Sequence, residues 1–364
     1  MLIYVCSSSH GFGHAARDIA VLQAVHQRRP DWRLVLSSQL NERVLRSLIG
    51  ETPIQIRPCR WDVGMVQADA LGSDPTSTLQ ALDYLNQQLP ELLRGEAEWI
   101  RSCGTPALIF GDIPPAAAAL ADRLDAPMIW MSNFGWDAIY APFGDAFDNA
   151  VMAAREAYGR GSLLLRCPFD LPMDWGVPEV RLPLVCSAPR SLPGRVLEQL
   201  EAVDKPMVMI GFGGLGLSIT PSQLKRWPDH HFLMAQPTSQ AERNRFTAIP
   251  NLTVLPPGLR PLDVFPHCQR HLGKPGFSTF CEAMAQSVGL HVVERRNFAE
   301  VRGLIQGLQQ HSPHRLLSRR QFEAADWQLD QDLVPAAALP LPADGASLAA
   351  EQIMALAQAS FGLV

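Results

Sequence analysis

The sequence predicts an α/β protein of two domains, each built on a parallel β-sheet. Three observations lead to this prediction. The chain has 364 residues, which is more than a single hydrophobic core serves efficiently. Short apolar runs alternate with helical patterns, as they do in parallel βαβ units. Each half of the chain also opens with an apolar strand that runs into a glycine-rich turn.

The expected elements follow from these patterns. In the first half we expect strands at residues 2–8, 33–38, 106–112 and 127–133. In the second half we expect strands or strand ends at residues 206–214, 231–236, 252–256, 271–276 and 290–294. The first helix repeats apolar residues at three- and four-residue spacing, which gives it one apolar face to lay on the sheet, and its other face is polar. The apolar positions are Ala15, Ile19, Leu22 and Val25.

A segment rich in Pro, Ser and Gly, residues 181–195, indicates the linker between the domains. We therefore expect an N-terminal domain over residues 1–187 and a C-terminal domain over residues 188–345. A last helix, 346–364, follows a Pro-rich stretch and could pack back on the N-terminal domain.

The composition limits the partners. Hydrophobic residues make up 47% and charged residues 18%, which argues against disorder. A formal charge of −5 offers no broad basic surface, so we expect no nucleic-acid partner. The seven scattered cysteines include no C-x-x-C pair, and no metal site is expected. Without an apolar run of membrane-spanning length, we expect a cytoplasmic protein, and peripheral membrane contact stays open.

The first glycine turn, SSSHGFGHAARD at residues 7–18, places two histidines where a strand meets a helix. Ligands of open α/β sheets bind at that edge, and an imidazole there can serve as a general base. The candidates are His10 and His14. The alternative is that one of them only caps or satisfies the turn.

The same turn matches the dinucleotide fingerprint G-x-G-x-x-G/A, and residues 211–216 match it again. That fingerprint requires an acidic residue at the end of the second strand. Ser37, Ser38 and Gln39 stand there in the first half, and Pro237 and Thr238 in the second. The sequence therefore disfavours an oxidoreductase.

Asp112 ends the strand at residues 106–112. A carboxylate at that place can orient a histidine on the neighbouring loop and hold its tautomer. The alternative is an N-cap, because two prolines follow and a helix begins after them.

The most specific stretch is residues 271–300, where a strand ends in Gly273-Lys274-Pro275-Gly276 and a helix begins near Ser278 and Thr279. Backbone N–H groups, hydroxyls and the positive end of a helix suit a diphosphate, and Lys274 would add a charge. Glu282 could reach ribose hydroxyls. The competing interpretation is a T-x-x-E capping box of Thr279 and Glu282, which needs no ligand.

The loop at residues 211–218 carries four glycines, including Gly213 and Gly214, whose backbone amides could approach phosphate oxygens. A plain glycine-rich turn is the alternative.

These motifs resemble the GT-B class of glycosyltransferases, and in particular bacterial transferase-like proteins related to the N-terminal domain of plant arabinose kinases. The resemblance spans both domains, from residue 7 to about residue 300. The matching stretches are SHGFGHAARD, WDVGMVQADALGSD (61–74), MSNFGWDAIY (131–140), IGFGGLGLS (210–218) and GKPGFSTFCEA (273–283). The resemblance implies two Rossmann-like domains that face each other across a cleft.

The resemblance also implies roles for single residues. In related inverting transferases the histidine of the first glycine turn is the general base, which corresponds to His14, and an aspartate that orients it corresponds to Asp112. By the same resemblance Glu282 binds the donor ribose, Glu300 binds the donor sugar hydroxyls, and the pyrophosphate lies on Gly276, Ser278 and Thr279. On the acceptor side the family stretches contribute His10, Gln67, Asp69, Asn133 and Trp136 as candidates.

Plant transferases of secondary metabolism carry His-Cys-Gly-Trp before the Ser-Thr pair and a Gln after the acid. This chain has Gly273 to Phe277 and Val301 at those places. The identity of the donor therefore does not carry over, although a UDP-linked sugar is the expected co-substrate.

We expect an inverting, metal-independent glycosyltransferase that moves a hexosyl or pentosyl group from a nucleoside-diphosphate sugar to a hydroxyl acceptor, with no further cofactor. Two alternatives remain. One is a non-catalytic nucleotide-sugar sensor or partner protein, and the other is a nucleotide-sugar epimerase on the same fold.

Overall fold

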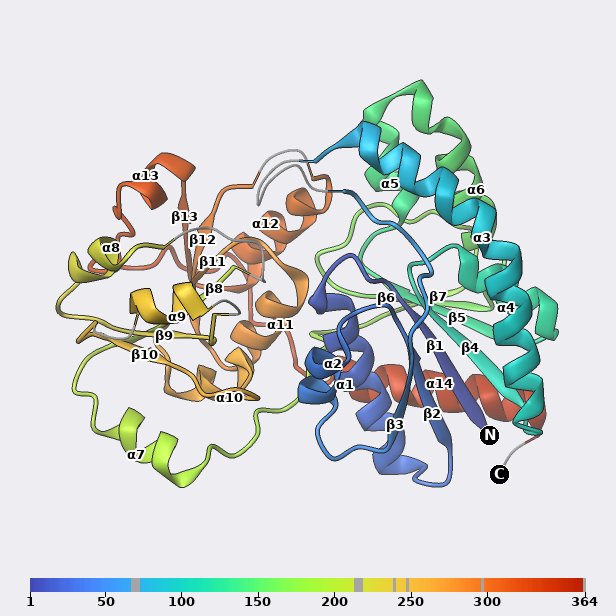
Figure 1. Cartoon of the computed structure of the whole chain (residues 1–364), viewed down its shortest axis with the longest axis horizontal. Coiled ribbons are helices and arrows are strands. Elements are labelled where there is room, and N and C mark those ends of the chain that lie inside the picture. Colours follow the sequence, from blue (N-terminus) through green and yellow to red (C-terminus); the bar gives the residue numbers. More distant parts are fainter. Residues whose placement is uncertain (67–72, 213–218, 238–239, 247–248, 296–297, 363–364) are drawn as a thin grey trace. The chain divides into compact units, whose positions relative to one another are not determined.

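The computed structural model describes residues 1–66, 73–212, 219–237, 240–246, 249–295 and 298–362. The chain forms two compact units (Figure 1). Unit 1 comprises Met1–Ser187, Asn297–Gly303 and Pro342–Val364, and unit 2 comprises Ala188–Arg296 and Leu304–Leu341. Residues 297–303, which the linear sequence places late in the second half, thus belong to the first unit.

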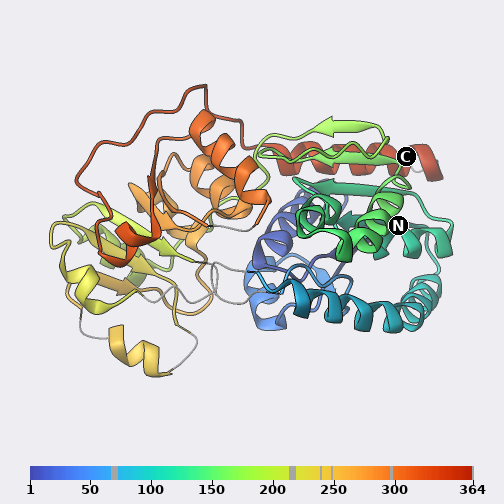
Figure 2. The same cartoon turned by 90° about the horizontal axis from the view of Figure 1, so that it is seen from above.

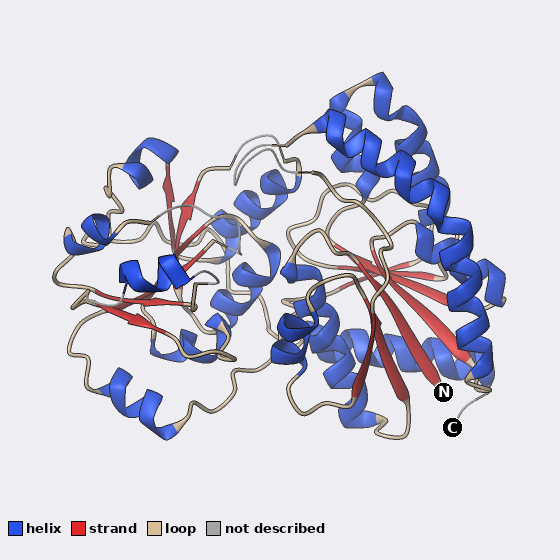
Figure 3. Cartoon of the chain, viewed as in Figure 1, coloured by secondary structure: helices blue, strands red, loops and turns tan. Residues whose placement is uncertain are grey.

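Unit 1 is built on a sheet of seven strands in the order β3-β2-β1-β4-β5-β6-β7, and every neighbouring pair is parallel. The strands are β1 (Leu2–Ser7), β2 (Arg33–Ser37), β3 (Ile54–Arg57), β4 (Ala107–Asp112), β5 (Met128–Ser132), β6 (Leu163–Arg166) and β7 (Glu179–Arg181). Helices flank this sheet (Figure 3). They are α1 (Phe12–Arg28), α2 (Glu42–Ile49), α3 (Pro75–Ser102), α4 (Ala116–Leu124), α5 (Trp136–Tyr140), α6 (Asp148–Tyr158) and α14 (Gly345–Phe361), with short 3₁₀ turns at Ala141–Phe143 and Asp145–Phe147.

Unit 2 is built on a sheet of six parallel strands in the order β10-β9-β8-β11-β12-β13. The strands are β8 (Met207–Gly211), β9 (His231–Met234), β10 (Leu252–Val254), β11 (Arg270–Gly273), β12 (Gly289–Val293) and β13 (His314–Leu317). The helices are α7 (Gly194–Glu201), α8 (Pro221–Lys225), α9 (Gln240–Phe246), α10 (Pro261–Val264), α11 (Phe277–Ala285), α12 (Glu300–His311) and α13 (Arg319–Glu323), with a 3₁₀ turn at Phe265–His267. The first residues of α12, up to Gly303, belong to unit 1.

The two sheets share one topology. In each, the chain lays down three strands in one direction from the centre and then returns to the centre to continue in the other direction. The order reverses between β1 and β4 in unit 1, and between β8 and β11 in unit 2. Open parallel sheets bind ligands beyond the carboxyl ends of the strands at such a reversal. Each unit therefore has one predictable place for a site.

The central strand β1 forms from a continuous run of apolar residues. Residues 2–6 of β1 are fully buried, as expected for a parallel sheet that is covered on both faces. The apolar face predicted for the first helix is also buried, at Ala15, Ile19, Leu22 and Val25. The opposite, polar face of this helix is not fully exposed to solvent, because Arg17 and Asp18 on α1 are buried as well.

The C-terminal helix α14 belongs to unit 1 and packs beside α1 (Figure 2). Its buried side chains are small, mainly alanines, which lets the two helices approach closely; Ile353 is the large exception. At the end of α1, the Arg28 guanidinium donates to the Ser347 hydroxyl at 2.6 Å. Among the residues that the structure describes, no helix is long and apolar enough to cross a membrane.

The buried Ile353 side chain should carry much of the energy that holds α14 in place. We expect Ile353→Ala to lower the free energy of unfolding by about 2–4 kcal/mol, because the substitution removes buried methylene groups and leaves a cavity. Chemical denaturation measures the effect, with the exposed Gln358→Ala as the matched control. Equal stabilities of the two variants would contradict this account of how α14 is held.

Candidate active site

His14 and Asp112 are brought together by the sheet of unit 1. β1 and β4 are neighbours, and Ser7 at the end of β1 lies in register with Asp112 at the end of β4. The chain then turns through Gly11 into α1, whose first turn carries His14. The result is a contact of 3.1 Å between His14 Nδ1 and Asp112 Oδ1, although 98 residues separate them. This contact lies where the strand order reverses.

Asp112 is fully buried and is also held by Arg17. Arg17 Nε donates to Asp112 Oδ2 at 2.7 Å, and Arg17 Nη2 donates to Asp112 Oδ1. Burial alone would raise the pKa of Asp112, but the charges of Arg17 and His14 outweigh it and hold that pKa well below its ordinary value. The aspartate is therefore an anion at every pH of practical interest. The alternative that Asp112 caps the next helix is wrong, because Pro115 is the N-cap residue of α4 and no side chain caps that helix.

The backbone directly after Asp112 is strained. Ile113 has a φ of 66°, in the left-handed region that β-branched residues rarely adopt. Such a conformation costs on the order of 1–3 kcal/mol and persists only where the surroundings enforce it. Here the Tyr158 hydroxyl donates to the Ile113 carbonyl at 2.9 Å. The turn that aims Asp112 is thus maintained at a cost in stability, as is common at functional sites.

His14 keeps one ring nitrogen for other partners. Its side chain is largely buried, and the edge of the ring packs against Phe134 at a centroid distance of 5.9 Å. Both polar contacts of the ring, to Asp112 and to Arg17 Nη2 at 3.1 Å, involve Nδ1. No hydrogen bond to Nε2 is found within the described part of the chain. Because an arginine N–H can only donate, Nδ1 cannot donate to Asp112 and accept from Arg17 at the same time. When Nδ1 donates to Asp112, Nε2 carries the lone pair that a general base needs, and Arg17 Nη2 is then a neighbouring charge that bonds to Asp112.

Asn133 and Glu300 extend the cluster. Asn133 directly follows β5, and its Oδ1 accepts from Arg17 Nη1 at 2.7 Å. Because arginine can only donate, this bond fixes the orientation of the amide. Asn133 Nδ2 then donates to Glu300 Oε1 at 3.0 Å. Glu300, expected on the donor side, is the first residue of α12 and lies in the segment that belongs to unit 1.

Two other acceptor-side candidates lie in an aromatic cluster. The ring of His10 stacks on Phe298 at 5.5 Å and meets Trp136 edge to face at 5.3 Å. Trp136 is buried, and its indole N–H donates to Asp62 Oδ2 at 2.9 Å. Burial raises the pKa of Asp62, although hydrogen bonds and the charge of His14 oppose this. Trp136 thus helps to build the wall behind the histidines.

Gln67 and Asp69, the remaining acceptor-side candidates, lie outside the described residues, as do Gly213 and Gly214 of the donor loop.

Sequence reasoning missed Arg17, Asp18, Asp62 and Phe298. A signal was present for the first two, since they follow His14 by three and four positions, which puts them on the same side of a helix. Asp18 is completely buried, and burial, with the negative charge of Asp112 next, raises its pKa well above the ordinary value. Burial thus favours the neutral form of Asp18 beside the Arg17–Asp112 ion pair. That spacing alone does not distinguish Arg17 and Asp18 from a solvated helix face.

In unit 2, the predicted donor site lies at the adjacent ends of β8 and β11. Gly211 and Gly273 are in register there. A Cβ atom on Gly273 would run into the Gly211 carbonyl and the ring of His271, so this place requires glycine. The chain then continues through Lys274 to the N-cap of α11 at Gly276. The second site therefore also occupies a reversal of the strand order.

The start of α11 lacks a cap from the side chain of its N-cap residue. That residue is Gly276, which has no side chain that could bond to the first turn. A Cβ at Gly276 would meet nothing within 4 Å, so open space adjoins the helix start. Thr279 is the third residue of the helix, which rules out the capping box with Glu282. Ser278 lies in the same first turn and is buried. The arrangement suits an anion at the positive end of a helix.

Glu282 lies two turns into α11 and is only partly exposed. Burial raises its pKa to about 7; the charge of Arg260 opposes this shift and that of Asp263 adds to it. Arg260 itself pairs with Asp263, with Nε 3.1 Å from Oδ1. Within the described part of the chain, the Glu282 carboxylate has no hydrogen-bond partner. Its oxygens are thus available to accept hydrogen bonds from the hydroxyl groups of a ligand.

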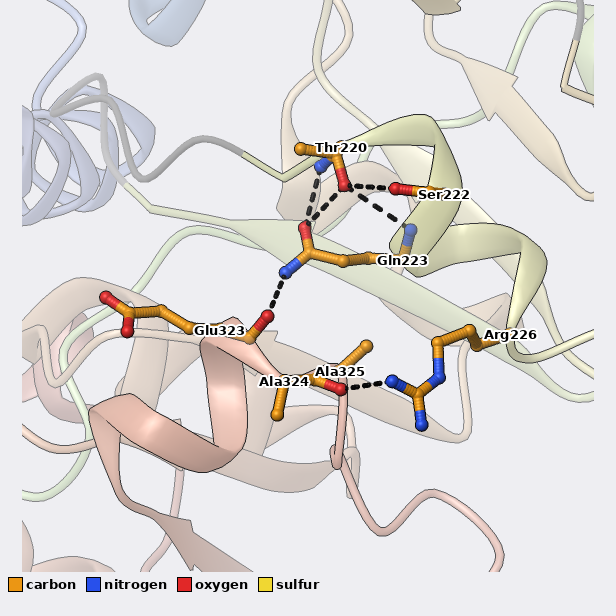
Figure 4. Close-up of a pocket in the computed structure, with 7 residues that line it drawn as sticks. All are labelled: Thr220, Ser222, Gln223, Arg226, Glu323, Ala324 and Ala325. Carbon is orange, nitrogen blue, oxygen red and sulfur yellow. Dashed lines mark hydrogen bonds between the residues drawn. The ribbon is translucent and has the colours of Figure 1, made fainter.

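A surface pocket of about 310 Å³ lies elsewhere in unit 2, between α8 and α13 (Figure 4). Its polar groups bond to each other: Gln223 caps α8 with Thr220 and donates to the Glu323 carbonyl at 3.0 Å, and Arg226 donates to the Ala324 carbonyl at 2.6 Å. None of the predicted donor residues lines it. Across the described residues, no group of three or more His, Cys, Asp or Glu side chains is arranged to hold a metal ion.

No protein-family profile matches the chain. An L-arabinokinase from Arabidopsis thaliana is 28% identical over 303 residues, which cover 80% of this chain and 28% of that protein. The chain thus spans less than a third of the length of this relative.

Solved structures match the whole chain at low identity. UGT89C1 of Arabidopsis thaliana, complexed with UDP-L-rhamnose, has a TM-score of 0.56 at 14% identity, over 96% of this chain and 89% of that one. CalG4, the calicheamicin glycosyltransferase, has a TM-score of 0.61 at 14% identity, over 99% of both chains. The chain has the GT-B glycosyltransferase fold. This confirms the predicted fold class of two Rossmann-like domains.

The GT-B fold is not limited to transferases among these neighbours. A Listeria monocytogenes protein assigned as a UDP-N-acetylglucosamine 2-epimerase has a TM-score of 0.60 at 15% identity, over 99% of this chain and 96% of that one. The fold alone therefore leaves the reaction to be argued from the site.

The raised pKa of Glu282 has a consequence for stability. Between its ordinary pKa of about 4.5 and about 7, the folded protein holds a proton that the unfolded chain releases, so the stability falls as the pH rises through this range. We expect Glu282→Gln, which cannot ionise, to be more stable than the parent at pH 8 by on the order of 1–3 kcal/mol and equal to it near pH 4.

Denaturant unfolding at both pH values measures this difference, with the exposed Glu198→Gln as control. A Glu282→Gln protein that gains no stability at pH 8 would show that the carboxylate is solvated.

Proposed function

We propose that the protein is an inverting glycosyltransferase that moves a sugar from a nucleoside-diphosphate sugar to a hydroxyl acceptor without a metal ion. The observation that carries this proposal is the His14–Asp112 contact of 3.1 Å, while none of the described residues bonds to Nε2 of the ring. It provides a general base at the ligand-binding edge of unit 1. The uncapped start of α11 provides an anion site at the corresponding edge of unit 2.

The chemistry of unit 1 is proton transfer. His14 Nε2 takes the proton of the acceptor hydroxyl while the acceptor oxygen attacks the anomeric carbon of the donor. Asp112 accepts from Nδ1–H, which keeps the ring in the tautomer whose lone pair is on Nε2. Attack from the side opposite the leaving group inverts the configuration at the anomeric carbon. Asn133 and His10 flank this base and are the described candidates for contact with the acceptor.

The chemistry of unit 2 is stabilisation of the leaving group. As the bond from the anomeric carbon to the phosphate oxygen breaks, its electron pair stays on the nucleoside diphosphate. The first-turn amides of α11, the Ser278 and Thr279 hydroxyls and Lys274 would hold that charge, which a metal ion neutralises in other enzymes. Glu282 would accept hydrogen bonds from the ribose hydroxyls. Glu300 would accept them from the donor sugar.

The comparisons support a nucleotide sugar as the ligand. The UGT89C1 structure holds UDP-L-rhamnose, and the epimerase neighbour is named for a UDP-sugar. The sequence relative is named for a pentose, L-arabinose. A UDP-linked hexose or pentose is therefore the first donor class to test.

Removing the base should abolish transfer while donor binding remains. We expect His14→Ala to lower kcat by about 10²–10⁴-fold with a given acceptor and UDP-sugar, and Asp112→Asn to lower it as well. Product formation followed by mass spectrometry measures the rates. His26→Ala, at the far end of the same helix, is the matched control and should retain activity. A His14→Ala protein with full activity would remove the mechanism.

Donor binding can be tested without an acceptor. A UDP-sugar at about one hundred times its dissociation constant should add close to 3 kcal/mol to the stability, which a thermal-shift assay detects. Because the ionised carboxylate of Glu282 is a stronger acceptor for the ribose hydroxyls than the neutral acid, the affinity should rise as the pH increases through about 7. Glu282→Gln should bind more weakly and lose this pH dependence. An unchanged affinity in that variant would sink the ribose assignment.

A second function is favoured by one specific observation, the epimerase among the structural neighbours. An epimerase would convert the UDP-sugar into an isomer in the absence of any acceptor, and chromatography of the incubated donor distinguishes this outcome from transfer. A protein that binds the donor but forms neither an isomer nor a glycoside would be a nucleotide-sugar sensor.

A further inference from the structure

Arg17 connects the two ends of the unit 1 site. It is almost entirely buried, with 1% of its surface exposed, and it lies one helical turn after His14 on α1. On one side its guanidinium grips both oxygens of Asp112. On the other side its Nη1 donates to Asn133, which in turn donates to Glu300. The planar guanidinium of Arg17 therefore fixes both Asp112, the partner of the base, and Asn133, which holds Glu300.

The charge of Arg17 matters as much as its shape. The negative charge of Asp112 would, if unopposed, favour the protonated imidazolium form of His14, which cannot accept a proton from an acceptor. Arg17 balances that charge. Burial favours the neutral form of Arg17, but the charge of Asp112 outweighs this effect. The pKa of the guanidinium is therefore raised above its ordinary value, and Arg17 keeps its charge.

The other groups around His14 change this balance little. Burial raises the pKa of Asp18 on α1 and favours its neutral form, and Cys167 after β6 is a neutral thiol because burial raises its pKa to about 12. Asp62, on the segment after β3, is the remaining carboxyl group whose charge acts on His14, and burial raises its pKa. Arg17 is therefore the principal counter-charge to Asp112.

We infer that Arg17 is the positioning residue of this site, with two separable tasks. Its charge offsets Asp112 so that His14 stays able to accept a proton, and its fork turns Asn133 so that Glu300 is held for the donor sugar. The second task rests on the proposed function. The first is a property of the folded protein alone.

Three substitutions separate the tasks. Lysine supplies the charge but only one point of contact, so Arg17→Lys should keep the first task and lose the second. Methionine supplies neither. Asn133→Leu should lose only the second task, because Arg17 and Asp112 remain paired. The matched control is Arg46→Met, which removes an exposed arginine that pairs with Glu42 on α2.

The first task is measured without turnover. In protein labelled with ¹³C at the histidine rings, the His14 signal, assigned by its loss in His14→Gln, is followed by NMR as a function of pH. Arg17→Met should move the midpoint of its titration to higher pH by about one unit or more, and Asp112→Asn, which leaves Arg17 unopposed, should move it to lower pH. Arg17→Lys and Asn133→Leu should leave it near that of the parent protein.

An unmoved midpoint in Arg17→Met, or one that moves as far in Arg17→Lys, overturns the first task. Arg17→Met also leaves a buried carboxylate without its counter-charge and can fail to fold. In that event Arg17→Gln takes its place, because the amide is neutral but can still donate to Asp112. The same rise in the midpoint is expected, and an unmoved midpoint overturns the first task.

The second task is measured by calorimetry with a UDP-sugar that binds the parent protein. Arg17→Lys and Asn133→Leu should each weaken the affinity about tenfold, and the double variant should be no weaker than either single variant, since both break one chain of hydrogen bonds. Additive losses, or no loss, overturn this task.

These outcomes separate the inference from the proposed function. If the parent protein binds and transfers no sugar, the proposed function and the second task fail together, while the NMR midpoints still decide the first task.

Discussion

A single buried carboxylate dictates the organisation of unit 1. Asp112 ends a central strand with no exposed surface, and an anion in that position is tolerated only if its charge is balanced and its oxygens are bonded. Arg17 supplies both the charge and two hydrogen bonds, and His14 adds a third contact. The first helix must therefore begin where it does, because both partners come from its first two turns. The glycine turn before that helix brings His14 and Arg17 to Asp112.

The same requirement explains the backbone strain next to the site. A carboxylate at the end of a strand would ordinarily point along one face of the sheet and be followed by extended chain. Here the next residue, Ile113, adopts a left-handed conformation that β-branched residues avoid. The ion pair and the bond from Tyr158 hold the turn in place. Strain of this kind survives where the surrounding structure over-determines the geometry.

The sequence was sufficient for the architecture and for part of the site. Uninterrupted apolar strands and glycine turns predict two parallel sheets, and a histidine on one turn with an aspartate at a strand end predicts a contact across 98 positions. The sequence did not predict that Arg17 is buried, since a charged residue on the polar side of a helix normally faces water. The sequence also did not predict that Glu300 lies in unit 1. The resemblance assigns it to the donor sugar, but no local pattern shows that residues 297–303 return to the first unit and bond to Asn133.

The start of α11 shows how geometry decides between two interpretations that the sequence left equal. A capping box would make Thr279 the last residue before the helix and would bond Glu282 back to the chain. The helix instead begins at Phe277, directly after Gly276, so that Thr279 is already its third residue. A glycine N-cap offers no side chain as a cap, and a Cβ at Gly276 would meet open space. Glu282 is thereby left without a partner in the described structure, at a cost that its raised pKa reflects. A carboxylate kept half-buried and unbonded beside an uncapped helix start contributes nothing to the stability of the fold. Its presence is explained when a ligand supplies both the anion for the amides and the hydroxyls for the acid.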